Sequence, residues 1–121
     1  MNLTAFNRFC ESLPHTAHVV QWGGAHVWKV GGPKGKMFAI GWPEVKGLLV
    51  TFKVSQLAYD ILKEQDGLIP APYLASRGMT WIQRVTDATM DDAALKDYLK
   101  QSHRLCALAL SKSVQKQLGL N

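Results

Sequence analysis

The sequence predicts an α+β domain with a five-stranded antiparallel sheet and three helices packed mainly on one face, in the order α-β-β-β-β-α-β-α. Between His18 and Val54, short apolar runs alternate with turns that contain glycine or proline, which is typical of consecutive antiparallel strands. On either side, apolar residues recur at the spacing of amphipathic helices. A chain of 121 residues that is 47% hydrophobic can bury one core, so we expect residues 1–121 to form a single domain.

The first helix is expected over residues 2–12, where apolar side chains recur at helical spacing. Asn2 or Thr4 can cap its start, because short polar side chains accept hydrogen bonds from free backbone N–H groups. Pro14 ends the helix, since the residue before a proline avoids the α region.

Four strands are expected at residues 17–22, 25–30, 36–42 and 47–54. Gly23-Gly24 suits a two-residue hairpin turn between the first two strands. In the third strand, alternation places Phe38, Ile40 and Trp42 on one face. At strand spacing, aromatic residues are more often core residues than binding residues, so the core is the expected place of Trp28 and Trp42.

The second half of the chain is expected to hold a helix at 56–66, an irregular connection at 67–78, a strand at 79–85 and a final helix. Ser55 is a good N-cap for the first of these helices. Tyr73 to Ala75 can add a helical turn to the connection. Thr89 is expected to cap the final helix, which either breaks near Ser111 or runs on to Leu118.

The net charge of +5 is spread unevenly along the chain. Residues 18–55 carry five lysines against Glu44, and residues 98–121 carry four basic groups and no acid. Residues 56–97 carry four basic and seven acidic groups. Two basic segments separated by an acidic one can form a polarised surface that favours a polyanion through counterion release. The alternative is that these charges are solvated groups that only add solubility.

The sequence lacks the motifs that are typical of several classes of enzyme and metal-binding protein. The loop Gly31–Lys36 is rich in glycine and lysine but has Val30 and Met37 where a phosphate-binding loop needs Gly and Ser or Thr. The four histidines and two cysteines show no zinc spacing, so no metal and no cofactor is expected. Nucleophile motifs such as Gly-x-Ser-x-Gly and Cys-x-x-Cys are also absent. We therefore expect a protein that is not an enzyme, although a weak enzyme of unknown reaction remains an alternative.

Basic residues in and beside the strands are the candidate binding residues. Hairpins and their loops can enter a DNA groove, and phosphate contacts need only exposed Lys and Arg side chains. The candidates for phosphate contact are Lys29, Lys34, Lys36, Lys46, Lys53, Arg77 and Arg84.

The cellular setting is expected to be the cytoplasm. The two cysteines, Cys10 and Cys106, lie at apolar helix positions and are expected to be reduced and buried. The N-terminus lacks the features of a signal peptide, and no apolar run approaches the length of a membrane span. We expect a monomer without membrane contact.

Short motifs in a fixed order resemble the MmcQ/YjbR family of small bacterial proteins over nearly the whole chain. In order, these are the helix ending near Pro14, a Trp-containing hairpin, Gly35-Lys36-Met37-Phe38-Ala39, Leu49-Val50-Thr51-Phe52-Lys53 with a helix directly after it, Pro72-Tyr73-Leu74 ahead of Gly78 and Trp81, and Ser102-His103-Arg104-Leu105. One departure is His103, where the family often has Tyr.

The resemblance implies a frataxin-like (CyaY-like) fold and a double-wing motif in which β-hairpins approach DNA. Iron binding is not implied, because the first helix has only Glu11 where frataxins have several acids. The expected function is therefore non-enzymatic DNA binding through backbone phosphates. The alternative is a module that binds a small ligand or a protein, with a pocket between the sheet face and residues 67–78. Trp81 and Ser102 can equally be packing residues, and so can the stems of Lys36 and Lys53.

Overall fold

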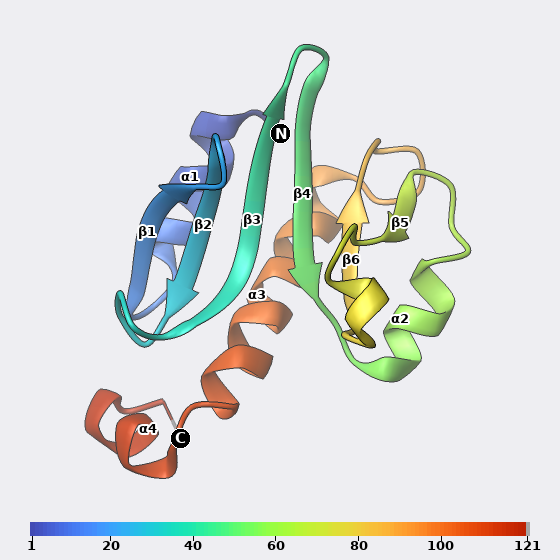
Figure 1. Ribbon diagram of the computed structural model, residues 1–121. Coiled ribbons are helices and arrows are strands. Elements are labelled where there is room, and N and C mark those ends of the chain that lie inside the picture. The colour runs from blue at the N-terminus through green and yellow to red at the C-terminus, as the bar shows by residue number, and fades with distance from the viewer. Residues whose placement is uncertain (121) are drawn as a thin grey trace.

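The structure, a computed structural model, describes residues 1–120 and confirms the α+β class with an antiparallel sheet (Figure 1). The strands are β1 (Thr16–Gln21), β2 (Ala25–Val30), β3 (Lys36–Glu44), β4 (Gly47–Lys53), β5 (Leu68–Pro70) and β6 (Trp81–Arg84). The helices are α1 (Leu3–Ser12), α2 (Gln56–Leu62), α3 (Asp92–Leu108), α4 (Lys112–Leu118) and a 3-10 turn, η1 (Ala75–Arg77). Within residues 1–120 the sheet has six strands in the order β1-β2-β3-β4-β6-β5, one more than expected.

Helices α1 and α3 cover one face of the sheet, and η1 lies on the other (Figure 1). The main core lies between the sheet and these two helices. Its largest members, among them Phe6 from α1, Phe52 from β4 and Leu99 from α3, are fully buried. Burying a side chain of this size stabilises the fold by roughly 1.5–3 kcal/mol. We call the face turned away from α1 and α3 the open face.

A β-bulge in β3 changes which residues share a face. Trp28 pairs with Ala39 and Lys29 pairs with Met37, so Phe38 is an additional residue without a partner on β2. An inserted residue shifts the alternation of side chains by one position. Phe38 therefore joins the core under α3, whereas Ile40 packs on the open face. The expectation that these two side chains share one face is wrong for this reason.

Ser102 of α3 bridges β3 and β4 beside the bulge. The β3–β4 register ends at the pair Ala39 and Phe52, so the next pair is left without a direct ladder bond. The buried Ser102 hydroxyl fills this gap: it donates to the carbonyl oxygen of Phe38 at 2.6 Å and accepts from the backbone N–H of Lys53 at 2.9 Å. The helix is thus attached to the sheet where the ladder is interrupted, and Ser102 has a structural role.

The hairpin between β1 and β2 has three connecting residues instead of the expected two. Trp22 leaves the strand and adopts φ 54°, and the N–H of Gly24 donates to the carbonyl of Gln21 at 3.2 Å. The Trp22 ring is 57% exposed and stacks on Trp42, with ring centroids 6.5 Å apart. The positive φ of Trp22 thus accompanies the stacking of its ring on Trp42, and the alternation of side chains along a strand predicts neither.

The expected irregular connection contains the edge strand β5. Leu68 of β5 is buried in the main core, and the strand pairs with β6. Pro70 is tolerated because β5 lies at the edge of the sheet, where one side of the strand needs no ladder bonds. The expected helical turn in this connection is present as η1, two residues later than expected.

The final helix begins later than expected and is followed by a separate helix. Asp91, not Thr89, caps α3, because the Asp91 carboxylate accepts from the N–H of Ala94 at 2.8 Å. The Thr89 hydroxyl instead donates to the carbonyl of Asp66 at 2.7 Å. The break near Ser111 is confirmed, and Ser111 caps α4.

Candidate nucleic-acid interface and apolar groove

Four of the seven candidate basic residues gather at one end of the sheet. The loop between β2 and β3 carries Lys34 and is followed by Lys36, and β4 ends at Lys53 on the same end of the sheet. The Lys29 ammonium reaches this loop and donates to the carbonyl of Pro33 at 3.4 Å. We call the surface formed by Lys29, Lys34, Lys36 and Lys53 the basic end.

The electrostatics of Cys106 show that two of these lysines act on one point of α3. Burial raises the pKa of the Cys106 thiol, and the charges of Lys53 and Lys36 oppose this rise. The backbone beside both lysines contacts this part of α3, because Ser102 accepts from the Lys53 N–H and the Cys106 thiol donates to the carbonyl of Met37, the neighbour of Lys36. Neither Lys36 nor Lys53 has a carboxylate within ion-pair distance in the described part of the chain.

Helix α4 brings further positive charge to this end. It carries the exposed residues Lys112 and Lys116, and it lies at the lower end of the sheet in Figure 1, as the β2–β3 loop does. A Cβ atom placed on Gly31 of that loop would lie 2.9 Å from the Leu110 side chain, so the loop packs against the connection that leads into α4. Sequence reasoning did not single out these two lysines, although the basic charge of residues 98–121 was a signal.

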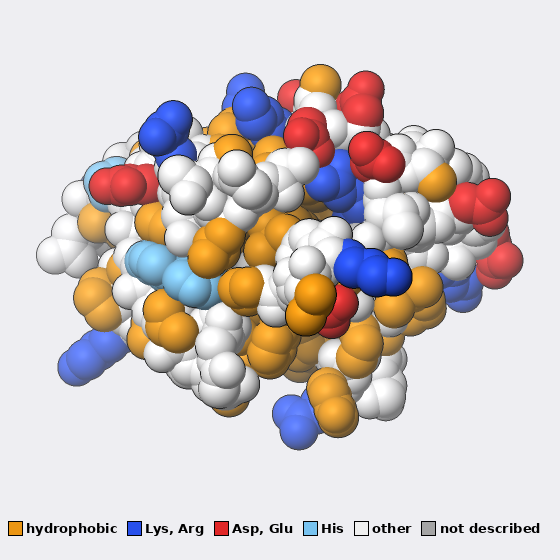
Figure 2. All heavy atoms as spheres, turned by 90° about the horizontal axis from the view of Figure 1, so that it is seen from above, with side chains coloured by type: hydrophobic (Ala, Val, Ile, Leu, Met, Phe, Trp, Pro, Cys, Tyr) orange, Lys and Arg blue, Asp and Glu red, His pale blue; other side chains and the backbone are white. Residues whose placement is uncertain are grey.

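Acidic residues gather at the opposite end of the sheet. Strand β6 runs antiparallel to β4, so the segments that follow β6 and precede β5 lie away from the basic end. In Figure 2, which views the molecule from above, acidic side chains gather in the upper middle and along the right-hand rim. Lys46, Arg84 and the Met1 ammonium lie at this end too, so the acids outnumber the basic groups here without excluding them. The acids of this end are Glu44, Asp66, Asp87, Asp91 and Asp92.

Two candidates are not part of the basic end. Lys46 is exposed in the turn between β3 and β4, roughly 26 Å from the start of β3 at the usual rise per strand residue. Arg77 belongs to η1, which leads into β6 beside Lys53, but its side chain lines a groove on the open face. Lys46 therefore lies at the opposite end of the sheet, and Arg77 contributes its charge to the groove.

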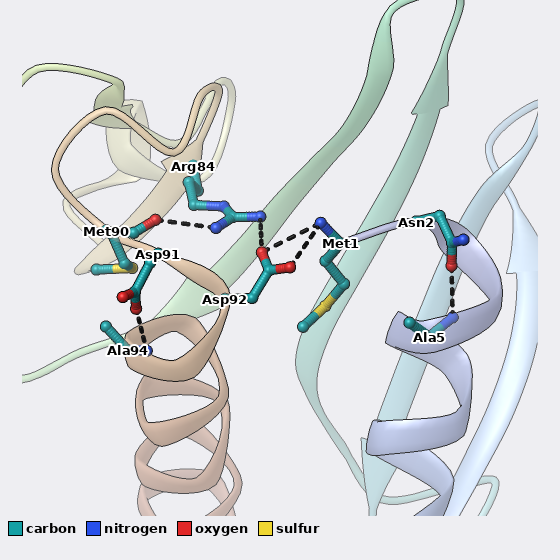
Figure 3. Close-up of polar contacts among 8 residues, drawn as sticks. All are labelled: Met1, Asn2, Ala5, Arg84, Met90, Asp91, Asp92 and Ala94. Carbon is teal, nitrogen blue, oxygen red and sulfur yellow. Dashed lines mark hydrogen bonds and ion pairs between the residues drawn. The ribbon is translucent and has the colours of Figure 1, made fainter.

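Arg84 is a structural residue, so its expected phosphate contact is wrong. Only 5% of its surface is exposed. Its guanidinium donates to the carbonyl of Met90 at 2.9 Å and to the carboxylate of Asp92 at 3.0 Å (Figure 3). Hydrogen bonds from the Met1 ammonium and from Arg84 lower the pKa of Asp92. Position 84 faces the helices because of its register with Val50, a detail that composition cannot show.

The open face contains an apolar groove with a volume of about 670 Å³. It is lined by the aromatic rings of Trp22 and Trp42 and by residues 72–74 of the connection. Ile40 of β3 and Leu49 of β4 also line it. Trp28 is buried in the main core, as expected. Trp42 is half-buried and packs against the smaller core cluster of Ala25, Val27 and Ile40, where it also lines the groove.

The expected pocket between the sheet face and residues 67–78 is thus present. Lys36, Lys53 and Trp81 do not line it. The floor instead holds two polar side chains, Thr51 and Gln83, and the Gln83 amide donates to the Thr51 hydroxyl at 3.2 Å.

A pair of histidines lies on the helix face near the edge of the sheet. The ring nitrogens of His18 and His26 are 2.9 Å apart, and the His18 ring stacks on Trp28 with centroids 4.6 Å apart. Burial and the neighbouring His26 lower the pKa of His18. Residues 1–120 contain no group of three or more His, Cys, Asp or Glu side chains placed to hold a metal ion. No helix in the same range is both long and apolar enough to cross a membrane.

Comparison with known proteins agrees with this architecture. The sequence model of the YjbR family matches residues 11–105. The crystal structure of Deinococcus radiodurans protein DR2400, which has a DUF419 domain, is similar with a TM-score of 0.85 and 23% sequence identity. The similarity covers 99% of this chain and 89% of that chain. A search of curated proteins gives no match. Because the family match covers most of the chain, including both the strand ladder and the Ser102 region, the chain belongs to the YjbR family.

Proposed function

We propose that this protein is a non-enzymatic DNA-binding protein that contacts backbone phosphates through its basic end. The observation that carries this proposal is the separation of charge along the strand direction. Within residues 1–120, lysines without a carboxylate at ion-pair distance occupy one end of the sheet, whereas five of the nine acids, together with Lys46, occupy the other.

A polarised charge distribution would orient the molecule as it approaches a polyanion. The basic end would turn toward the phosphates, while the acidic end would be repelled. Phosphate contacts made by lysine position a protein on DNA but carry no base information. The proposal therefore predicts binding with strong salt dependence and weak sequence preference.

The shape of the basic end also fits this role. Lys34 lies in the turn from Gly32 to Gly35, in which the Gly35 N–H donates to the Gly32 carbonyl at 2.9 Å, and Lys36 follows at the start of β3. A loop of this kind is a candidate wing. The proposal uses this loop and Lys53, and it gives no role to Lys46 at the distant turn or to the buried Arg84.

The test is a titration of a short fluorescent duplex by anisotropy at about 50 mM and about 200 mM salt. Each lysine that contacts a phosphate contributes about one unit to the slope of log affinity against log salt concentration. The double variant Lys36→Ala/Lys53→Ala should therefore bind more weakly than the parent protein, with a slope smaller by about two.

The matched control is Lys63→Ala/Lys96→Ala, which removes the same charge from the C-cap of α2 and from the N-terminal part of α3. Lys63 lies 3.6 Å from Asp60, and Lys96 lies over the Phe9 ring, so neither belongs to the basic end. This control, and Lys46→Ala, should keep the parent slope. Equal slopes for the two double variants, or binding that does not respond to salt, would contradict the proposal.

A further inference from the structure

We propose that the apolar groove on the open face binds a small planar aromatic molecule that carries an anionic group. None of the lysines of the basic end lines this groove, and the inference does not depend on the DNA-binding proposal. Its volume of about 670 Å³ is within the range of small-molecule sites, roughly 300–1,000 Å³.

The walls of the groove suit a flat ring. The rings of Trp22 and Trp42, with an interplanar angle of 19°, line the groove together with Tyr73. Trp22 and Tyr73 are 57% and 86% exposed, so their rings are available to a ligand. Aromatic side chains attract other rings by stacking and by apolar burial.

Both exposed rings are held in a backbone conformation that bulky residues rarely adopt. Trp22 has φ 54° and Tyr73 has φ 67°, and among residues 1–120 only one other non-glycine residue, His15, has positive φ. Such a conformation costs of order 1–3 kcal/mol and is often found at binding sites. Glycine would relieve this cost at both positions. Aromatic residues at these two positions are therefore better explained by a contact with a ligand than by local stability.

The polar groups of the groove define the chemistry of the ligand. Arg77 is the one charged residue in the lining, it is exposed, and no carboxylate lies within ion-pair distance among the described residues. A carboxylate or a phosphate on the ligand would complement this charge. The nearly buried Gln83 uses its amide nitrogen on Thr51, which leaves the amide oxygen to accept from a ligand N–H or O–H group.

The test uses two probes of the same shape that differ in charge, 8-anilinonaphthalene-1-sulfonate and the neutral N-phenyl-1-naphthylamine. Fluorescence titration measures the Kd of each probe. Arg77→Gln should weaken the sulfonate probe by about tenfold, which corresponds to the loss of one charge-assisted contact, and should leave the neutral probe unchanged. Lys63→Gln removes the same charge outside the groove and should change neither Kd.

Tyr73→Gly separates the ring from the backbone. Because glycine accepts φ 67°, the variant should unfold at the same or a higher urea concentration than the parent protein. It should still weaken both probes by about fivefold or more, since stacking on the ring is lost. A loss of stability without a loss of probe affinity would assign Tyr73 a structural role and overturn the inference.

Four indole N–H signals in a ¹H–¹⁵N spectrum locate the probe, one for each tryptophan. The signals of Trp22 and Trp42 should shift on binding, and those of the buried Trp28 and Trp81 should not. Equal Kd values for Arg77→Gln and the parent protein, or shifts confined to the buried indoles, would overturn the inference. Displacement of the probe by single-stranded or duplex DNA would also overturn it, because the groove would then belong to a nucleic-acid surface.

Discussion

Replacing Ser102 by alanine tests the account of how α3 is attached to the sheet. The Ser102 hydroxyl is fully buried and serves two backbone groups, the carbonyl of Phe38 and the N–H of Lys53. Alanine fits the same space but offers neither a donor nor an acceptor. Both backbone groups would then be buried without partners, because the β3–β4 ladder has already ended at Ala39 and Phe52.

The magnitude follows from these two lost partners. A buried backbone group without a hydrogen bond costs about 1–3 kcal/mol. Two such groups give an expected decrease of about 2–4 kcal/mol in the free energy of unfolding, after some relaxation of the strand ends. This is a large part of the stability of a domain of this size, typically about 5–15 kcal/mol.

Urea denaturation at neutral pH measures this loss for Ser102→Ala against the parent protein. Ser113→Ala, an exposed serine in α4, is the matched control and should change stability by less than about 0.5 kcal/mol. Amide hydrogen exchange supplies a local measurement, since the Lys53 N–H should lose protection. A loss below about 0.5 kcal/mol, or unchanged protection of the Lys53 amide, would refute the reasoning.

Three further predictions follow from buried contacts elsewhere in the fold. Arg84→Gln should lower the free energy of unfolding by about 2–3 kcal/mol, because its charged hydrogen bonds to a carbonyl and to Asp92 are lost. Burial lowers the pKa of His103 from 6.5, so the unfolded state binds the proton more tightly. Stability should therefore be full above about pH 6.5 and should fall as pH decreases toward the pKa of the folded state, as urea denaturation between about pH 8 and about pH 5 would show. Gly41→Ala should cost about 1–3 kcal/mol, because the new Cβ would lie 2.7 Å from the Phe6 ring.

Each of these predictions has its own contrary outcome. An Arg84→Gln variant with parent stability, or with a reduced salt slope in DNA titration, would restore Arg84 as a candidate phosphate contact. A pH profile that is equally steep in His103→Gln would assign the dependence to another group, with His18 the first candidate because its pKa is also lowered. A Gly41→Ala variant with an unchanged urea midpoint would mean that the Phe6 ring can move aside at little cost.

Local sequence signals determined most of the elements of this protein. The strand ladder, the cap at Ser55, the break at Ser111 and the α+β class all depend on residues close together in the chain. Family membership was likewise indicated by short motifs, and the family match confirms it. The position of the pocket beside residues 67–78 was also anticipated, since a proline-containing connection next to a sheet is a natural rim.

Only the tertiary structure decided which side chains share a surface. The Ser102 hydroxyl meets Phe38 and Lys53 across 64 and 49 positions of the chain. The bulge at Phe38 shifts the alternation in β3, and the register of β6 buries Arg84 while Arg77 stays exposed at the groove. The lysines likewise became one basic end only through the antiparallel register. Such outcomes depend on strand register and on packing between distant segments, and a local pattern carries no information on either.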